Sequence, residues 1–224
     1  MIKLVHFEIS GELIRKNAVF SEWIIESPEL FAEYVQELYV QCGKGEGRFV
    51  LSKDESEIDL PKVADMIMSP LGLDLNERKI INKLYSELVK VSVSEVMYER
   101  TAEITRYISD YIMDLEDSAN YTVQFSDRLD IAGLLKAMDV KYEEIEESLL
   151  EHLIRYIKLV VELLGVKLII FVNLRSYLSD RQFRELIQEI KYQEIKALFI
   201  ENQEKACIEG GMRYIIDKDG CEIY

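Results

Sequence analysis

The carboxylates of two neighbouring segments are the side chains of this chain best suited to hold a metal ion. Asp114, Glu116 and Asp117 close a stretch of helical character, and Asp127 and Asp130 follow after a polar segment. Calcium takes six to eight oxygen ligands, so carboxylates converging from two segments suit it. The spacing of an EF-hand loop is absent, and a solvated acidic turn is the other interpretation of the same residues. The residues alone leave both interpretations open.

The glycine-rich segment Gly43–Gly47 invites comparison with a phosphate-binding loop. Such a loop needs a strand before it and a helix after it, so that backbone N–H groups and the helix dipole meet the phosphate. Here the predicted order is helix, loop, strand, and a Gly-Lys-Ser/Thr pattern is absent. The two histidines, His6 and His152, are accompanied by no Gly-x-Ser-x-Gly elbow, so we expect both to be structural. We therefore expect no enzymatic activity.

The element that organises the chain is a strand–helix–strand unit in Val166–Glu201. Lys167–Val172 is a short apolar run typical of a strand buried on both faces. Ser179 begins a capping box, apolar residues then recur at helical spacing, and Ile195–Ile200 is a second buried strand. A unit this tight predicts a parallel sheet with a right-handed crossover. In nucleotide-binding proteins the end of such a strand carries a metal-binding acid, and here that place is held by Asn173.

Further α/β elements flank this unit on both sides. We expect two strands joined near Gly11, a helix with a strong start signal, another strand after the glycine-rich loop, and a C-terminal hairpin. In order, these expected elements are Ile2–Ile9, Glu12–Phe20, Ser27–Gln41, Arg48–Ser52, and the pair Arg213–Asp217 and Cys221–Tyr224.

The middle of the chain differs from the rest in its predicted secondary structure. From Pro61 to Asp117 almost everything is expected to be helical, with Asn76 capping a long helix. Asp130–Asp139 is predicted as a short helix, and Glu143–Leu164 as a longer one that stops at Gly165. The acids Glu143, Glu144, Glu146 and Glu147 would then form its solvated first turns.

These elements predict an α/β fold in which an all-helical subdomain is inserted into a sheet domain. We expect the sheet domain to comprise residues 1–60 and 128–224, and the helical subdomain residues 61–127. A central parallel strand–helix–strand unit would form the core of the sheet domain.

Composition narrows the classes of function further. The formal net charge is −15 and 49% of the 224 residues are apolar, so a real core is expected. Taken alone, the charge argues against nucleic acid and anionic membranes as partners, unless a basic face is segregated or a divalent cation offsets the acids. The three cysteines, Cys42, Cys207 and Cys221, indicate reduced thiols in a cytoplasmic protein. The N-terminus has no apolar signal core, and no apolar run approaches the length of a membrane span.

Short motifs spread along nearly the whole chain carry a family resemblance. They are Met1–Leu4, Asn17-Ala18-x-Phe20, Phe31, Val35, Leu38-Tyr39, Leu71–Asn76, Leu134–Lys141, Lys167–Asn173, Tyr177-Leu178, Leu198–Glu201, and Tyr214–Asp217 with Asp219. In their order and spacing the chain resembles the CRISPR-associated spacer-acquisition protein of subtype II-A systems, the Csn-two family.

This resemblance implies a head related to the α/β heads of ATPases but without nucleotide chemistry, joined to a helical leg. It implies a ring-shaped homotetramer that encircles double-stranded DNA, enters at free ends and needs calcium for its assembled form. It also implies that the protein supports spacer capture together with the CRISPR integrase and the RNA-guided nuclease. A structural scaffold without DNA contact and a degenerate nucleotidase are the alternative functions.

The resemblance also suggests site residues. The family's acidic segment is matched by Asp114-Leu115-Glu116, and a following aspartate by Asp127. Two departures stand out: extra residues precede Asp127, and Gly133 stands where the family has a glutamate, for which Asp130 could substitute. Basic positions of the family are matched at Lys136, Lys141 and Lys167, which are the expected DNA contacts; solvated surface lysines are the alternative.

Overall fold

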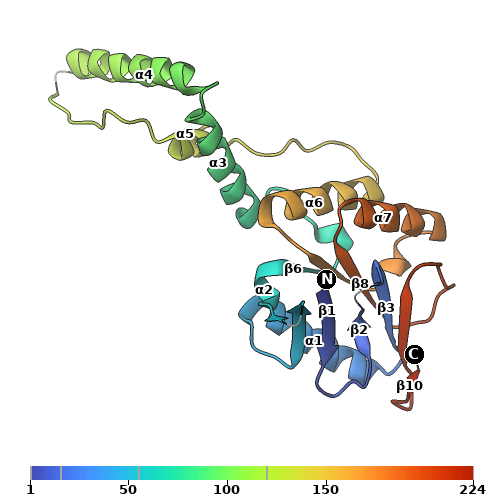
Figure 1. Cartoon of the computed structure of the whole chain (residues 1–224). Coiled ribbons are helices and arrows are strands. Elements are labelled where there is room, and N and C mark those ends of the chain that lie inside the picture. The colour runs from blue at the N-terminus through green and yellow to red at the C-terminus, as the bar shows by residue number, and fades with distance from the viewer. Residues whose placement is uncertain (1, 16, 55, 120, 224) are drawn as a thin grey trace. The chain divides into compact units, whose positions relative to one another are not determined.

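The computed structural model describes residues 2–15, 17–54, 56–119 and 121–223. By its internal contacts the chain divides into two compact units (Figure 1). Unit 1 comprises Met1–Leu75 and Ile145–Tyr224, and unit 2 comprises Asn76–Glu144. The domain boundaries expected from the sequence, at residues 60/61 and 127/128, stay a prediction.

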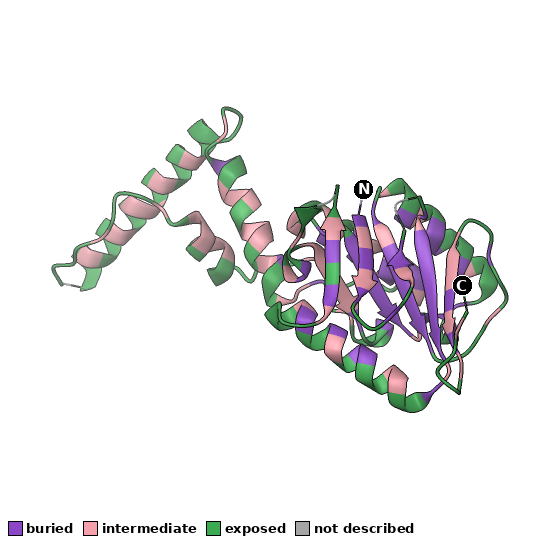
Figure 2. Cartoon of the chain, turned by 60° about the horizontal axis from the view of Figure 1, so that its bottom comes forward, coloured by how far each residue is buried: buried purple, intermediate pink, exposed green. Residues whose placement is uncertain are grey.

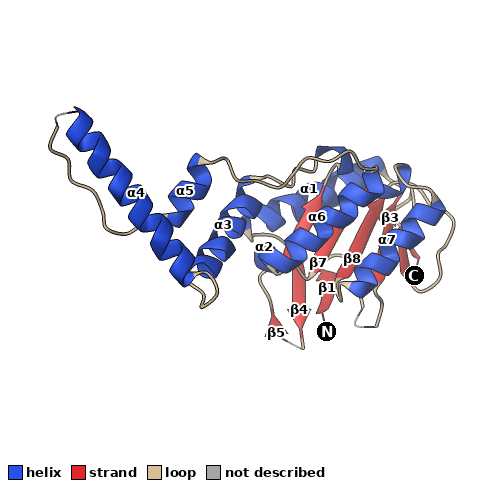
Figure 3. Cartoon of the chain, turned by 90° about the horizontal axis from the view of Figure 1, so that it is seen from above, coloured by secondary structure: helices blue, strands red, loops and turns tan. Residues whose placement is uncertain are grey.

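A six-stranded sheet is the centre of unit 1 (Figure 3). Its strand order is β10-β9-β3-β8-β7-β6, and the five strands from β9 to β6 are parallel to one another. The short β10 is antiparallel to β9 and closes the C-terminal hairpin. The strands are β3 (Phe20–Ile25), β6 (Ala64–Ile67), β7 (Leu168–Val172), β8 (Lys196–Glu201), β9 (Met212–Ile216) and β10 (Glu222–Ile223).

Both faces of this sheet are covered, which is why β3 and β7 are buried at every position (Figure 2). On one face, Phe20 and Phe199 make edge-to-face ring contacts with Phe183 of α7 (Asp180–Tyr192), which lies beside α6 (Leu149–Leu164) (Figure 1). On the other face, Trp23 packs against Tyr34 of α1 (Pro28–Lys44).

A second, antiparallel sheet completes the core on the α1 side. Its order is β2-β1-β4-β5, and its strands are β1 (Ile2–His6), β2 (Glu12–Ile14), β4 (Phe49–Lys53) and β5 (Ser56–Glu57). Leu4, Leu13 and Leu51 of this sheet belong to the same buried cluster as Trp23 and Leu168 of the six-stranded sheet. The two sheets therefore share one hydrophobic core.

Local sequence signals begin and end the long helices of unit 1. The Ser27 side chain accepts a hydrogen bond from the Leu30 amide, and Gly45 ends α1 in the left-handed region. Reciprocal capping boxes start α6 at Ser148 and α7 at Ser179, and the left-handed Gly165 ends α6. The start predicted at Ser179 and the stop predicted at Gly165 are thereby confirmed. Short helical turns complete the unit at α2 (Leu60–Val63), η1 (Pro70–Gly72) and η2 (Leu174–Ser176).

Unit 2 contains α3 (Arg78–Ser92), α4 (Tyr98–Ala119) and α5 (Ile131–Ala137). No residue of α4 is buried, whereas Ile80 of α3 is fully buried. The Tyr85 hydroxyl donates to the Val140 carbonyl at 2.9 Å, which ties α3 to the segment after α5.

Two strands of the six-stranded sheet differ from the sequence-based expectation. Glu12–Phe20 was expected as one strand, but β2 ends at Ile14 and a separate strand, β3, begins at Phe20. The charged Glu22 interrupts the apolar run of β3, so the sequence does not show the continuous apolar pattern of a buried strand there. The helical expectation from Pro61 onward is wrong at β6, whose four residues are too few to show a period and are held by pairing with β7.

Two helix starts were also placed incorrectly. Asn76 does not cap α3, which begins at Arg78 after Glu77; its side chain instead accepts from the Tyr142 amide at 2.8 Å and donates to the Tyr142 carbonyl at 3.1 Å. The helix expected from Glu143 begins at Leu149. Closely spaced acids repel one another, and Glu147 is drawn instead to His152 and Arg155, at 2.7 and 2.8 Å.

The fold is thus mixed α/β, with a parallel-rich sheet and several helices, as predicted at that level. Among the described residues, no helix is long and apolar enough to cross a membrane.

Candidate functional site

Asn173 lies where nucleotide-binding folds place an acid, directly after β7 at the edge where the parallel strands end. Its backbone is in the left-handed region, with φ of 53°. Its amide donates to the Ile200 carbonyl at 2.8 Å, and its side-chain oxygen accepts from the Asn202 amide at 3.1 Å. Asn173 therefore ties the end of β7 to the end of β8.

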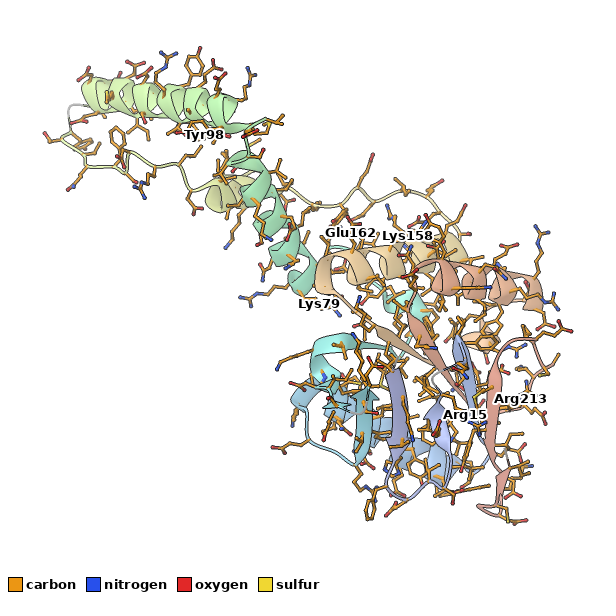
Figure 4. All side chains as sticks on the ribbon, viewed as in Figure 1. Arg15, Lys79, Tyr98, Lys158, Glu162 and Arg213 are labelled. Atoms are coloured by element: carbon orange, nitrogen blue, oxygen red, sulfur yellow. The ribbon has the colours of Figure 1, made fainter. Side chains whose placement is uncertain are left out.

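A buried ion network lies beside Asn173 at the same edge. Arg175 of η2 is 5% exposed and donates to Glu22 of β3 at 2.5 Å and to Asp180 at 2.9 Å. Arg213 of β9 (Figure 4) donates to the other Glu22 oxygen at 2.7 Å. The Arg175 guanidinium also covers the ring of Phe183, 4.6 Å from its centroid. Glu22 is therefore held by two arginines from two different elements.

Glu201 is a second buried carboxylate in this network. It accepts a hydrogen bond from the Arg175 amide at 3.0 Å. Burial raises the pKa of Glu201 to about 7, although the Arg175 hydrogen bond and charge oppose that shift. The raised pKa places the change of charge of Glu201 near neutral pH.

Sequence reasoning did not single out Glu22, Arg175, Glu201 or Arg213. A charged residue inside an apolar strand, as Glu22 is, and an arginine just after a buried strand, as Arg175 is, were the available signals. Buried charges require partners, so acids and arginines in buried segments predict that ion pairs form among them. The sequence does not show which acid meets which arginine. At this edge the charged side chains of the protein pair with one another, so their charges are not available to a ligand.

The glycine-rich segment has the predicted order of elements around it. Helix α1 ends at Lys44, Gly45 is its left-handed cap, and β4 begins at Phe49. The arrangement presents the negative, C-terminal end of α1 to this loop. A phosphate would be repelled there and not attracted.

The acids proposed from the sequence lie in unit 2, on α4 and on the segment that follows it. Asp114 and Glu116 are two positions apart on α4, so they point to nearly opposite sides of the helix. The Glu116 side chain accepts from the Val123 amide at 3.3 Å, so it faces the segment that leads to Asp127. Asp127 is exposed, and Asp130 is the N-cap residue of α5.

These acids do not form a ready metal site in a single chain. Within the described ranges, no three His, Cys, Asp or Glu side chains come together in a way that would hold an ion. The opposed directions of Asp114 and Glu116 are one reason, since an ion that bound both would require the last turns of α4 to rearrange. Any calcium site built from them needs further ligands or a change in conformation.

The three lysines proposed from the sequence are all exposed but belong to different parts of the chain. Lys136 is the basic residue in the last turn of α5, and Lys141 follows that helix and pairs with Asp139 at 3.3 Å. Both lie in unit 2, whereas Lys167 lies directly before β7 in unit 1. The Lys167 amide donates to the Val63 carbonyl at 2.7 Å, so only its side chain is free to meet a ligand.

Comparison with known proteins decides the family. The family model described as CRISPR-associated protein (Cas_Csn2) matches residues 41–220, most of the chain. The chain belongs to the Csn2 family. It is 23% identical over 206 residues to the CRISPR-associated protein Csn2 of Enterococcus faecalis, covering 87% of each chain. It is 24% identical over 225 residues to the CRISPR-associated protein Csn2 of Streptococcus agalactiae, covering 98% of this chain and 96% of that one.

The resemblance inferred from the sequence motifs is thereby confirmed. Csn2 membership implies a role in CRISPR spacer acquisition, within antiviral defence, and Csn2 proteins are generally non-catalytic adaptation proteins. The match includes β6, β7, β8 and β9, so the sheet edge that carries Arg175 and Glu201 lies within the Csn2 region.

Proposed function

We propose that this Csn2 protein is a non-enzymatic, sequence-independent double-stranded DNA-binding protein that acts as a ring-shaped homotetramer in spacer acquisition. The family match over residues 41–220 carries the proposal. We assign residues 1–60 and 128–224 to an ATPase-like head and residues 61–127 to a helical leg, apart from β6, which pairs with β7 of the head. The CRISPR integrase and the RNA-guided nuclease are the proposed protein partners, calcium the proposed cofactor, and the cytoplasm the proposed location.

The ion network at the edge of the sheet supports a non-enzymatic function. Glu22, Arg175 and Arg213 are committed to one another at 2.5 to 2.7 Å, and Asn173 is committed to the backbone of Asn202. A catalytic metal site at this edge would need free carboxylate oxygens, and a phosphate would need free guanidinium donors. Breaking a buried ion pair to supply either group is costly.

An exposed apolar seam on α4 supports self-association. Ile104, Tyr107, Tyr111 and Leu115 follow three-four spacing, and their exposed fractions are 37%, 62%, 62% and 48%. Side chains of this kind gain free energy when a partner covers them. A second copy presenting the same seam would cover it in the way that paired helices do, which suits an assembly made from identical chains.

Binding of DNA by a chain with a net charge of −15 requires its lysines to be segregated on the DNA-facing wall. Lys136, Lys141 and Lys167 are our candidates for that wall. The Lys141–Asp139 pair is exposed on both sides, so a phosphate can compete for the lysine at little cost. Contacts of this type go to phosphates and not to base edges, so they carry no sequence information.

We expect a gel-shift titration to separate linear duplex from covalently closed circular duplex. A ring that threads DNA enters at an end, so it binds linear duplex and fails to load on closed circles of the same sequence. The triple variant with alanine at Lys136, Lys141 and Lys167 should flatten the log–log salt dependence by about 0.9 for each phosphate that it no longer neutralises.

A matched control for this variant carries alanine at Lys62, Lys90 and Lys158, which changes the net charge equally. These lysines are also at least half exposed, at 77%, 65% and 51%, and each pairs with an acid of unit 1 or unit 2. Equal affinity for closed and linear DNA at matched salt would defeat the ring. Equal salt slopes in the two triple variants would defeat our choice of lysines and leave the ring standing.

We also expect calcium to promote assembly through Asp114, Glu116, Asp127 and Asp130. Since no three described acids of a single chain come together in a way that would hold an ion, the ligand set would be completed only as chains assemble or α4 rearranges. Clustered carboxylates repel one another, and a divalent ion removes that repulsion. Size-exclusion chromatography should show a tetramer in calcium and smaller species in chelator.

The variants Asp114→Asn and Asp127→Asn should resemble the chelated protein even in calcium. Asp110→Asn is the matched control, because Asp110 is also an exposed acid of α4 but lies outside the proposed ligand set. An elution profile that is the same with calcium and with chelator would show that calcium does not control the assembly of this chain. An Asp110→Asn variant that behaves like Asp127→Asn would point to bulk charge in place of a site.

A further inference from the structure

A large open cavity lies in unit 1 where the parallel strands begin, at the opposite end of β3 and β9 from the Asn173 edge. Its volume is about 860 Å³, which is within the range of cavities that hold small molecules. Both sheets contribute to it. Its walls come from β1, β2, β4, the β2–β3 connection and the segment that leads into β9.

Arg15 gives this cavity an available positive charge. It lies in the connection between β2 and β3 and is exposed (Figure 4). The other cation of the lining, Lys3, pairs with Glu12 at 2.8 Å. Within the described part of the chain Arg15 forms no ion pair. A guanidinium presents its donors in a planar fork that matches two oxygens of a phosphate group.

A bare stretch of main chain faces the same cavity. Gly210 has φ of +88°, a conformation that side-chain-bearing residues rarely adopt. A Cβ atom on Gly211 would lie 2.2 Å from the ring of Phe20, which excludes any side chain there. The ring of Phe20 thus accounts for Gly211, whereas Gly210 has open space where a side chain would lie, so a ligand can approach its backbone closely. Backbone N–H groups are common partners of phosphate oxygens.

The rest of the lining suits the other parts of a nucleotide. The Ser52 hydroxyl lines the cavity and can bond a sugar hydroxyl group, whereas the Glu12 carboxylate is paired with Lys3. Ala18 and Met212 supply apolar surface that suits a base. Cation, bare backbone, polar side chains and apolar surface thus lie in one cavity of sufficient volume.

We infer that this cavity binds a nucleoside 5′-phosphate, with Arg15 as the residue that recognises the phosphate. The same chemistry is offered by a free nucleotide and by the phosphorylated 5′ end of a DNA strand. Only the second source rests on the proposed DNA-binding function. The inference concerns binding without turnover, and it goes beyond the sequence-independent DNA contacts proposed above.

The experiment is isothermal titration calorimetry of the full chain with AMP, dAMP and adenosine. AMP and dAMP should bind, and adenosine, which lacks the phosphate, should bind about tenfold more weakly or worse. Arg15→Gln should weaken AMP binding by a similar factor. The matched control is Arg181→Gln, because Arg181 is 87% exposed on α7 and lies outside the cavity.

A second arm compares blunt duplexes with 5′-phosphate and with 5′-hydroxyl ends. If the end phosphate improves binding in the wild type and not in Arg15→Gln, the DNA end is a ligand of the cavity. If nucleotides bind through Arg15 and the two duplexes behave alike, the free nucleotide is the ligand, even where DNA binding itself fails. Nucleotide and end-phosphate binding that are both absent, or both unchanged in Arg15→Gln, would overturn the inference.

Discussion

Arg175→Ala is expected to destabilise this protein strongly. It removes a guanidinium that is 5% exposed and leaves Glu22, which is 3% exposed, with Arg213 as its remaining arginine. Breaking a buried ion pair by removing one partner costs about 3–5 kcal/mol. Domains of ordinary stability have about 5–15 kcal/mol in total, so urea unfolding should show a large fall in the transition midpoint.

The control for this substitution is Arg181→Ala, which removes an arginine that is 87% exposed and pairs with Glu185 across one helical turn. Surface pairs of this type contribute about 0.3–0.5 kcal/mol. A paired variant, Arg175→Met with Glu22→Gln, removes both charges of this pair and leaves Glu204 as the acid that pairs with Arg213, so it should recover much of the stability. If Arg175→Ala unfolds at the same urea concentration as Arg181→Ala, the network is not a stabilising element.

Glu201→Gln is expected to change how stability depends on pH. Burial raises the pKa of Glu201 to about 7 from its ordinary value of 4.5, so in the folded protein this carboxyl holds its proton over a range where the unfolded chain has released it. The folded state then binds more protons than the unfolded state between these two values. Stability therefore falls as pH rises from about 4.5 to about 7 and is level above it, for a total of about 3 kcal/mol.

Glutamine removes this titration and keeps an oxygen that can accept from the Arg175 amide, the bond that Glu201 accepts at 3.0 Å. The variant should therefore gain stability over the wild type above pH 7 and match it near pH 4.5, as measured by urea unfolding at a series of pH values. Glu209→Gln, an exposed glutamate in the same C-terminal segment, is the control for removal of one charge. A difference between wild type and Glu201→Gln that stays constant with pH would contradict the assignment.

Local sequence signals predicted the elements whose structure depends on neighbours in the chain. The apolar run Lys167–Val172, the capping box at Ser179 and the glycine at Gly165 each act within a few residues, and all are found as expected. The family was also predictable from the sequence, because several motifs in a fixed order together identify it even though no single motif is decisive. The helix–loop–strand order around Gly43–Gly47, which disfavours a phosphate loop, was predicted for the same local reasons.

Tertiary structure decided what depends on distant partners. Strand β6 has four residues and exists because β7 supplies its hydrogen bonds, and β3 carries a glutamate that only Arg175 and Arg213 make tolerable inside a sheet. Asn76 binds the backbone of Tyr142, 66 positions away, in place of capping a helix. The periods, the caps and the family could be read from the residues alone, because these features act locally or through residue identity. Which charges meet, which cation stays available at Arg15 and which acids remain apart required the folded chain, because electrostatic pairing depends on distances that spacing along the sequence does not contain.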